Sequence, residues 1–353
     1  MWKIGMLVLG ALSGIFALAS ESRADPPMRC ADVVFAVALS PGEPADDEIY
    51  GRLCARGSIH NKTMQILLHG GSYDHRYWDW PLDSEQYSYV EAMTAAGYAT
   101  LSVDRIGTGL SSHPADANAV TLHSSAYTVH QVVQQLREGR HVVRRFGRLR
   151  ARRVELVGFS LGSFIATIEA SVYGDVDGVV LTAYSHTLGP AALASFDLAY
   201  PANLEPAFAD LPDGYLTTLP GVRSELFFYT PGVDPAILAL DEQIKQTYTI
   251  GELADIFPSM PASLGVEVPV LLVVGDEDLM SCEAPSCTAT GSLANEAANY
   301  APEAGFEMVI IPEAGHSLNL HYAAGSAFEA IREWSDRRVG ARPMFDPPGR
   351  CFH

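Results

Sequence analysis

The sequence predicts an α/β fold in which a mostly parallel central sheet is covered by helices on both sides. Short apolar runs alternate with longer helix-like segments over most of the 353 residues. The run Val268–Val274 is almost entirely β-branched or leucine, which is typical of a strand buried on both faces. The composition, 48% hydrophobic and 18% charged, is that of a globular protein with a large core. Because no long Gly/Ser- or Pro-rich linker occurs, one large domain with an insertion is favoured over two independent domains.

The first half of the chain supplies most of the predicted sheet. Two strands open the chain as a hairpin, and the third ends at His69-Gly70-Gly71. The segment Ser124–Phe146 has helical periodicity and a basic end, which suits the negative end of a helix dipole. The predicted strands are Ala31–Leu39, Ile49–Cys54, Met64–Leu68, Tyr98–Val103 and Val154–Val157, and the predicted helices are Ser84–Ala96, Ser124–Phe146 and Leu161–Tyr173.

The second half completes the sheet around an insertion. We expect strands at Val176–Thr182, Val268–Val274 and Glu307–Ile311, and a closing helix at Ala323–Arg338. Between about 186 and 262 the alternation stops, over a span too long for a loop in a compact fold. We predict a helical cap at 187–262, inserted between core segments 25–186 and 263–353. Most of its aromatic residues would form the cap's own core, and two or three would line an apolar substrate pocket.

The N-terminus has the pattern of a secretory signal peptide, residues 1–24. Lys3 precedes an apolar core from Ile4 to Ala19, and small residues offer cleavage after Ala19 or Ala24. The alternative is a single membrane anchor, which the short apolar run disfavours. We therefore expect a secreted or periplasmic protein without stable membrane insertion.

The five cysteines agree with export to an oxidising compartment. Our predicted bridges are Cys30–Cys54 and Cys282–Cys287, with Cys351 left over, although sequence alone does not determine the pairing and free thiols are the alternative. The spacing of Cys282 and Cys287 is not that of a zinc knuckle, and no histidine pair lies near them, so we expect no metal. The net charge of −19 argues against a nucleic-acid partner, because phosphate binding needs clustered Lys and Arg.

The pentapeptide Gly158-Phe159-Ser160-Leu161-Gly162 is the most informative motif. It lies between a predicted strand and a predicted helix, the place where a G-x-S-x-G sequence forms a nucleophile elbow. Glycines two positions before and after the serine permit the sharp turn, and the serine hydroxyl then projects into a cleft. The pentapeptide by itself is common by chance, so its place between strand and helix carries the prediction.

The elbow serine needs a base and a carboxylate. His316 follows the last predicted strand in a glycine-containing loop and is the predicted base, with His321 as the second choice. Asp278 follows the most apolar strand and is the predicted acid that orients the imidazole, whereas Asp276 and Glu277 are expected to be solvated loop charges. The order Ser160, Asp278, His316 along the chain differs from the orders of the chymotrypsin and subtilisin triads.

Two backbone N–H groups are needed to bind the oxyanion of a tetrahedral intermediate. Leu161, the first residue after the nucleophile, is expected to supply one from a helix N-terminus. Gly71 is the first choice for the other and Ser72 the second, because both follow an early strand. The alternative is that this glycine-containing loop is a plain turn.

Together these motifs resemble the α/β-hydrolase superfamily, in the capped branch with an H-G-x oxyanion loop. The matching residues are Leu68–Gly71, Asp104–Ser111, Gly158–Gly162, Gly275–Asp278 and Gly315-His316. The resemblance spans residues 60–340 and implies the α/β-hydrolase fold, with the Asp104–Ser111 loop near the site in a structural role. Epoxide hydrolases and haloalkane dehalogenases of this superfamily carry Asp at the elbow, so Ser160 disfavours both activities.

The resemblance implies a serine esterase that forms an acyl-enzyme on Ser160 and needs no metal or organic cofactor. The loop after His69 lacks the early proline of prolyl aminopeptidase-like members, which disfavours peptidase activity. Tyr73, Trp78 and Phe159 are expected to flank the substrate, the alternative for the first two being packing under the cap. The expected substrate is a small apolar or aromatic ester. A lactonase, an amidase or a cofactor-free perhydrolase would use the same triad, and a non-catalytic binding module is the alternative of another class.

Overall fold

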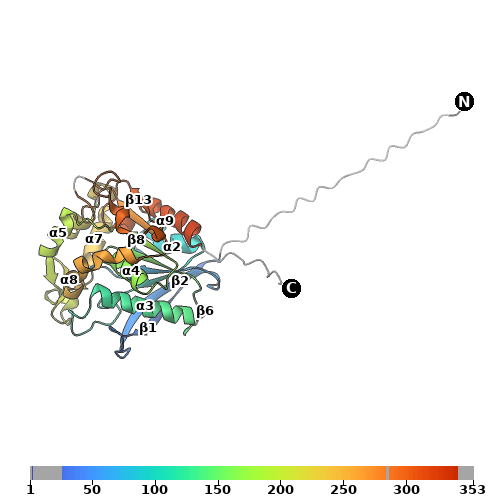
Figure 1. The fold of residues 1–353 in the computed structure, drawn as a ribbon, viewed down its shortest axis with the longest axis horizontal. Coiled ribbons are helices and arrows are strands. Elements are labelled where there is room, and N and C mark those ends of the chain that lie inside the picture. The colour runs from blue at the N-terminus through green and yellow to red at the C-terminus, as the bar shows by residue number, and fades with distance from the viewer. Residues whose placement is uncertain (1, 3–25, 284–285, 341–353) are drawn as a thin grey trace.

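An eight-stranded mixed sheet forms the centre of the structure (Figure 1). The computed structural model describes residue 2, residues 26–283 and residues 286–340. The strand order is β1-β2-β4-β3-β7-β8-β12-β13, with antiparallel pairing at β1–β2 and β2–β4 and parallel pairing elsewhere. The strands are β1 (Met28–Val37), β2 (Asp47–Arg56), β3 (Met64–Leu68), β4 (Ala99–Val103), β7 (Val154–Phe159), β8 (Gly178–Thr182), β12 (Val270–Gly275) and β13 (Glu307–Ile311).

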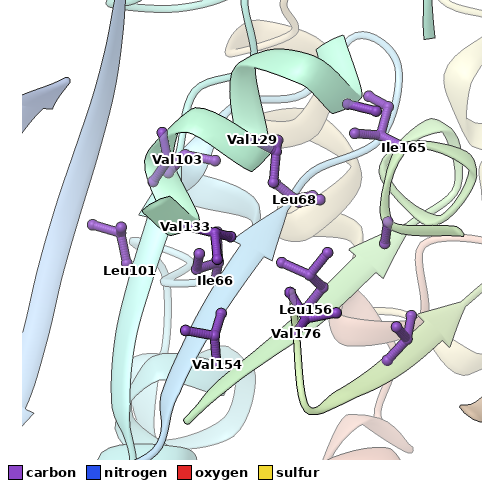
Figure 2. Close-up of a cluster of buried hydrophobic side chains, with 14 of the residues drawn as sticks. Ile66, Leu68, Leu101, Val103, Val129, Val133, Val154, Leu156, Ile165 and Val176 are labelled. Carbon is purple, nitrogen blue, oxygen red and sulfur yellow. The ribbon is translucent and has the colours of Figure 1, made fainter. Parts of the chain in front are cut away.

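Helices cover both faces of this sheet, as predicted. On one face lie α3 (Leu122–Glu138) and α4 (Leu161–Val172), and on the other lie α1 (Ser84–Tyr87), α2 (Tyr89–Ala95) and α9 (Ala324–Arg338). Successive strand residues point to opposite faces, so Ile66 and Leu68 join the core beneath α3 and α4 whereas Leu67 joins the core beneath α2 and α9. Figure 2 shows the first of these cores, where Val133 of α3 lies beside Ile66 and Val129 beside Leu68.

Two predicted helices have different bounds in the structure. The helix expected at Ser84–Ala96 is divided at Ser88, whose backbone is extended and whose side chain accepts a hydrogen bond from the Glu91 N–H to cap α2. The helix expected at Ser124–Phe146 ends at Glu138, because Gly139 adopts a left-handed conformation with φ 69°. The basic residues that follow lie in a hairpin of β5 (His141–Val143) and β6 (Gly147–Leu149), not in a helix end.

The chain between β8 and β12 contains the predicted short helices and also a small sheet that the sequence did not indicate. The helices α5, α7 and α8 gather at one side of the central sheet (Figure 1). Strands β9, β10 and β11 pair in the antiparallel order β11-β10-β9. The elements are α5 (Pro190–Asp197), β9 (Ala199–Pro201), β10 (Tyr215–Thr218), α6 (Arg223–Phe227), α7 (Pro235–Gln243), β11 (Tyr248–Thr249) and α8 (Ile250–Ser259).

Single 3-10 turns connect the longer elements. The turns are η1 (His75–Tyr77), η2 (Ala202–Leu204), η3 (Pro206–Phe208), η4 (Thr230–Gly232), η5 (Met260–Gly265), η6 (Glu296–Asn299), η7 (Pro302–Ala304) and η8 (Leu318–Leu320).

Both predicted disulfides are present. Cys30 and Cys54 are directly opposite each other on β1 and β2, and Cys282 is bonded to Cys287. The predicted signal peptide and Cys351 lie outside the described residues, apart from Trp2. Each helix within the described ranges is too short or too polar to cross a bilayer.

Candidate active site

Ser160 lies in a strained turn between β7 and α4. Its backbone has φ 53° and ψ −117°, which L-residues rarely adopt. A Cβ on Gly162 would come within 2.1 Å of the Leu68 carbonyl oxygen, and one on Gly158 within 2.5 Å of the Gly162 carbonyl oxygen. Only glycine fits at these two positions, because Gly162 lies against the end of β3 and Gly158 against the first turn of α4.

The ends of three parallel strands bring the predicted triad together. His316, after β13, has its Nε2 2.9 Å from Ser160 Oγ. Its Nδ1 lies 3.0 Å from each carboxylate oxygen of Asp278, after β12. Asp278 is fully buried and His316 is 4% exposed, whereas Ser160 is half-buried. The hydrogen-bonded chain therefore runs from a buried carboxylate to an accessible hydroxyl.

The loop that carries Asp278 is held by its own backbone. Asp278 Oδ1 accepts hydrogen bonds from the N–H groups of Met280 and Ser281, at 3.0 and 3.1 Å. The N–H of Cys282, which is disulfide-bonded to Cys287, donates a hydrogen bond to the Asp278 carbonyl. Asp276 and Glu277 are half-buried rather than fully solvated, and neither is hydrogen-bonded to His316.

His321, the second choice for the base, has a different role. Its Nε2 accepts hydrogen bonds from the N–H groups of Gly315 and Tyr229, and its Nδ1 donates to the Ser317 carbonyl. Burial lowers the pKa of His321 to about 4, which keeps the ring neutral in this arrangement. Both ring nitrogens of His321 are thereby engaged in holding the His316 loop, and it is His316 that is hydrogen-bonded to Ser160.

The predicted oxyanion donors converge beside Ser160. Leu161 is the first residue of α4, and Gly71 and Ser72 approach it from the loop after β3. Within the described part of the chain, the N–H groups of Leu161 and Gly71 have no hydrogen-bond acceptor. Free N–H groups next to the serine hydroxyl are what an oxyanion hole requires.

An apolar cavity opens from Ser160 and His316. The empty space of the cavity and its mouth together is about 810 Å³. Among the residues that the structure describes, its walls contain hydroxyl groups but no Asp, Glu, Lys or Arg side chain. Apolar lining residues come from α4 and from the segment between β8 and β12: Leu161, Phe164, Leu188, Ala192, Phe196, Phe227, Leu253 and Ile256.

A family model described as the alpha/beta hydrolase family matches residues 65–328. The chain belongs to this family. The match spans the elbow, the Asp278 loop and the His316 loop, which agrees with the resemblance stated from the motifs. No curated protein matches the sequence.

Solved structures show the same alpha/beta hydrolase fold at low sequence identity. An esterase from Thermogutta terrifontis is 18% identical, with a TM-score of 0.55 over 87% of this chain and 98% of that chain. A soluble variant of monoglyceride lipase from Saccharomyces cerevisiae is 14% identical, with a TM-score of 0.58 over 86% and 96%. An epoxide hydrolase from Vigna radiata is 15% identical, with a TM-score of 0.56 over 87% and 98%. These similar structures include an esterase, a lipase and an epoxide hydrolase. Because one fold supports different activities, the activity of this chain depends on its site.

The predicted substrate contacts of Tyr73, Trp78 and Phe159 do not match the geometry of this hydrolase. All three are buried and none is part of the cavity wall. Phe159 stacks on Tyr77 with ring centroids 4.0 Å apart, and Trp78 packs edge-on against Tyr77. The Tyr73 hydroxyl lies 2.6 Å from Ser317 Oγ. These rings form a packed aromatic layer behind the triad, because the sharp elbow points the Ser160 side chain toward the cavity and Phe159 away from it.

A buried ion pair beside the Gly71–Ser72 loop was not predicted. Arg223 of α6 donates to both carboxylate oxygens of Asp241 in α7, at 2.6 and 3.0 Å, and both side chains are 1% exposed. Arg223 Nη1 also donates to Ser72 Oγ at 2.7 Å. The available signal was weak: Arg223 is the only arginine between residues 186 and 262 of an otherwise acidic and apolar segment.

Proposed function

We propose that this alpha/beta hydrolase is a serine esterase that cleaves carboxylic esters of small apolar or aromatic substrates. One observation carries the proposal: the hydrogen-bonded chain Asp278–His316–Ser160 ends at a cavity without charged side chains. A cavity wall of this kind favours a neutral apolar acyl group, because burying a charged group there without a partner is unfavourable.

The mechanism follows from the distances. Ser160 Oγ attacks the acyl carbon while His316 Nε2, 2.9 Å away, accepts the hydroxyl proton. Asp278 fixes the ring through Nδ1 and stabilises the imidazolium that forms. The N–H groups of Leu161 and Gly71 bind the oxyanion, His316 returns the proton to the leaving alcohol, and a water activated by His316 releases the acid.

We further propose that residues 187–262 act as the cap that determines which esters enter. Phe196, Phe227 and Ile256 of this segment line the cavity together with Ser160 and Leu161 of the core. The two disulfides support the proposal that the protein acts in an oxidising compartment, secreted or periplasmic.

The nucleophile is tested by labelling with a fluorophosphonate probe. We expect labelling of the wild type and complete loss in Ser160→Ala. Ser171→Ala, on the same helix but away from the cavity, is the matched control and should label normally. Undiminished labelling of Ser160→Ala, or none of the wild type, would refute the assignment.

The bond is tested with nitrophenyl esters of rising acyl length, together with lactones and anilides. We expect the highest kcat/KM among the esters and a decline once the acyl chain exceeds the cavity. Faster turnover of lactones or anilides would favour the lactonase or amidase alternative on the same triad. Neither acylation nor turnover with any of these substrates would favour a non-catalytic module.

A further inference from the structure

A second cluster of titratable groups lies at the C-terminal end of α4, whose N-terminal residues Leu161 and Phe164 line the cavity. It consists of His130 on α3, Glu169 near the end of α4, and Asp175 in the loop that follows. One ligand atom from each residue lies within 4.8 Å of the other two. Glu169 is eight residues after Leu161, so the cluster is about 12 Å along the helix from the elbow.

Several polar atoms of the cluster have no hydrogen-bond partner. Both carboxylate oxygens of Glu169 are unpartnered within the described residues, and the side chain is fully buried. Asp175 Oδ1 and His130 Nδ1 are likewise buried without a hydrogen bond. His130 Nδ1 lies 2.9 Å from Asp175 Oδ2, but the geometry between the two atoms is not that of a hydrogen bond. A buried carboxylate beside a second carboxylate is unfavourable unless a proton or a cation lies between them.

Another cluster of the same composition shows that this is not a general feature of the protein. At Asp74, His75 and Asp104, the carboxylates are fully engaged. Asp104 accepts from the His75 N–H, the His75 ring and the Leu110 N–H, and Asp74 accepts from Arg76. That cluster is a closed hydrogen-bond network, so it needs no ion.

We propose that His130, Glu169 and Asp175 bind a divalent transition-metal ion, with Zn²⁺ as the best fit. One imidazole and two carboxylates match zinc ligation, whereas Ca²⁺ and Mg²⁺ prefer sites made only of oxygen ligands. The side chains of His130 and Asp175 are 22% and 14% exposed, which leaves room for a water ligand. Two carboxylates neutralise the charge of the ion.

The surrounding contacts position these ligands. Gln134 Nε2 donates to Asp175 Oδ2 at 2.5 Å, and Arg137 donates to the Asp175 carbonyl through Nε and Nη2. His130 stacks on Tyr173 with ring centroids 4.0 Å apart. A bound ion would join α3 to the end of α4, which stabilises the fold without contact with the reacting groups. The expectation of no metal rested on the spacing of Cys282 and Cys287, whereas these three ligands come from separate parts of the chain.

The test uses untagged protein treated with EDTA and then titrated with Zn²⁺. We expect one equivalent of zinc by elemental analysis and isothermal titration, and a rise of a few degrees in the unfolding temperature at saturation. Ca²⁺ and Mg²⁺ should leave that temperature unchanged. Glu169→Gln should lose the stoichiometric zinc, and so should His130→Asn.

His123→Asn is the matched control. His123 lies on the same helix and is 2.7 Å from the Asp255 carboxylate, but it is largely exposed and outside the cluster. It should bind zinc as the wild type does. The proposal is overturned if zinc does not bind the wild type stoichiometrically, or if Glu169→Gln binds it equally well. In that case a proton shared between Glu169 and Asp175 accounts for the pair, and Glu169→Gln should be as stable as the wild type.

Discussion

The Arg223–Asp241 pair offers the sharpest test of how the inserted segment supports the candidate site. In Arg223→Met, the Asp241 carboxylate stays 1% exposed and loses both of its guanidinium hydrogen bonds. Removing one partner of a buried pair leaves an uncompensated charge and destabilises by about 3–5 kcal/mol. We expect the free energy of unfolding to fall by that amount.

The same substitution should affect catalysis separately from stability. Ser72 has φ 59°, and the Arg223 Nη1 hydrogen bond to its hydroxyl holds this strained residue beside Gly71. A hydrogen bond to a charged group contributes about 1.5–3 kcal/mol. If that stabilisation acts on the position of the Gly71 N–H, its loss lowers kcat by about 10- to 150-fold, with a smaller change in KM.

The assay combines urea unfolding with ester hydrolysis at a temperature where every variant is folded. Arg223→Met/Asp241→Leu removes both charges, so most of the stability should return while kcat remains low. Arg52→Met, which breaks the exposed pair with Asp32, is the control and should change stability by less than about 1 kcal/mol. Wild-type kcat in a folded Arg223→Met variant would refute the argument that Arg223 positions the oxyanion loop.

Two further predictions concern the triad and a buried acid. Asp278→Asn keeps the shape of the side chain but favours the wrong tautomer of His316, so kcat should fall about 10⁴-fold with an unchanged unfolding temperature; a loss below tenfold contradicts the assignment of the acid. Burial raises the pKa of Glu155 to about 7 from 4.5, although Gln65 and Ser335 donate to it. Since the unfolded chain releases this proton first, the residue's contribution to stability is present below pH 4.5 and is lost as pH rises to about 7. The unfolding free energy of the wild type minus that of Glu155→Gln should therefore fall by up to about 3 kcal/mol across this window in urea titrations, and a constant difference would contradict the shift.

Much of the fold, and the order of the three triad candidates along the chain, could be predicted because both depend on local sequence patterns. Strand β3 has the predicted bounds since its apolar run ends at Leu68, just before His69-Gly70-Gly71. Ser160, Asp278 and His316 each follow an apolar strand, and parallel strands bring their carboxyl ends to one edge of a sheet. The helix bounds were less accurate, because one residue in an extended or left-handed conformation, Ser88 or Gly139, ends a helix whose periodicity continues.

The sequence by itself determined the fold class and the order of the three triad candidates, since strand periodicity and glycine spacing are local properties of the chain. The cysteine pairing, which the sequence left open, was decided by the structure. Only the tertiary structure decided which aromatic rings are buried behind Ser160 and which line the cavity. It alone joined Arg223 to Ser72, 151 positions apart, and placed His130, Glu169 and Asp175 in one cluster. Burial and the pairing of charges depend on which elements pack together. Local sequence patterns do not specify these contacts between residues that are far apart in the chain.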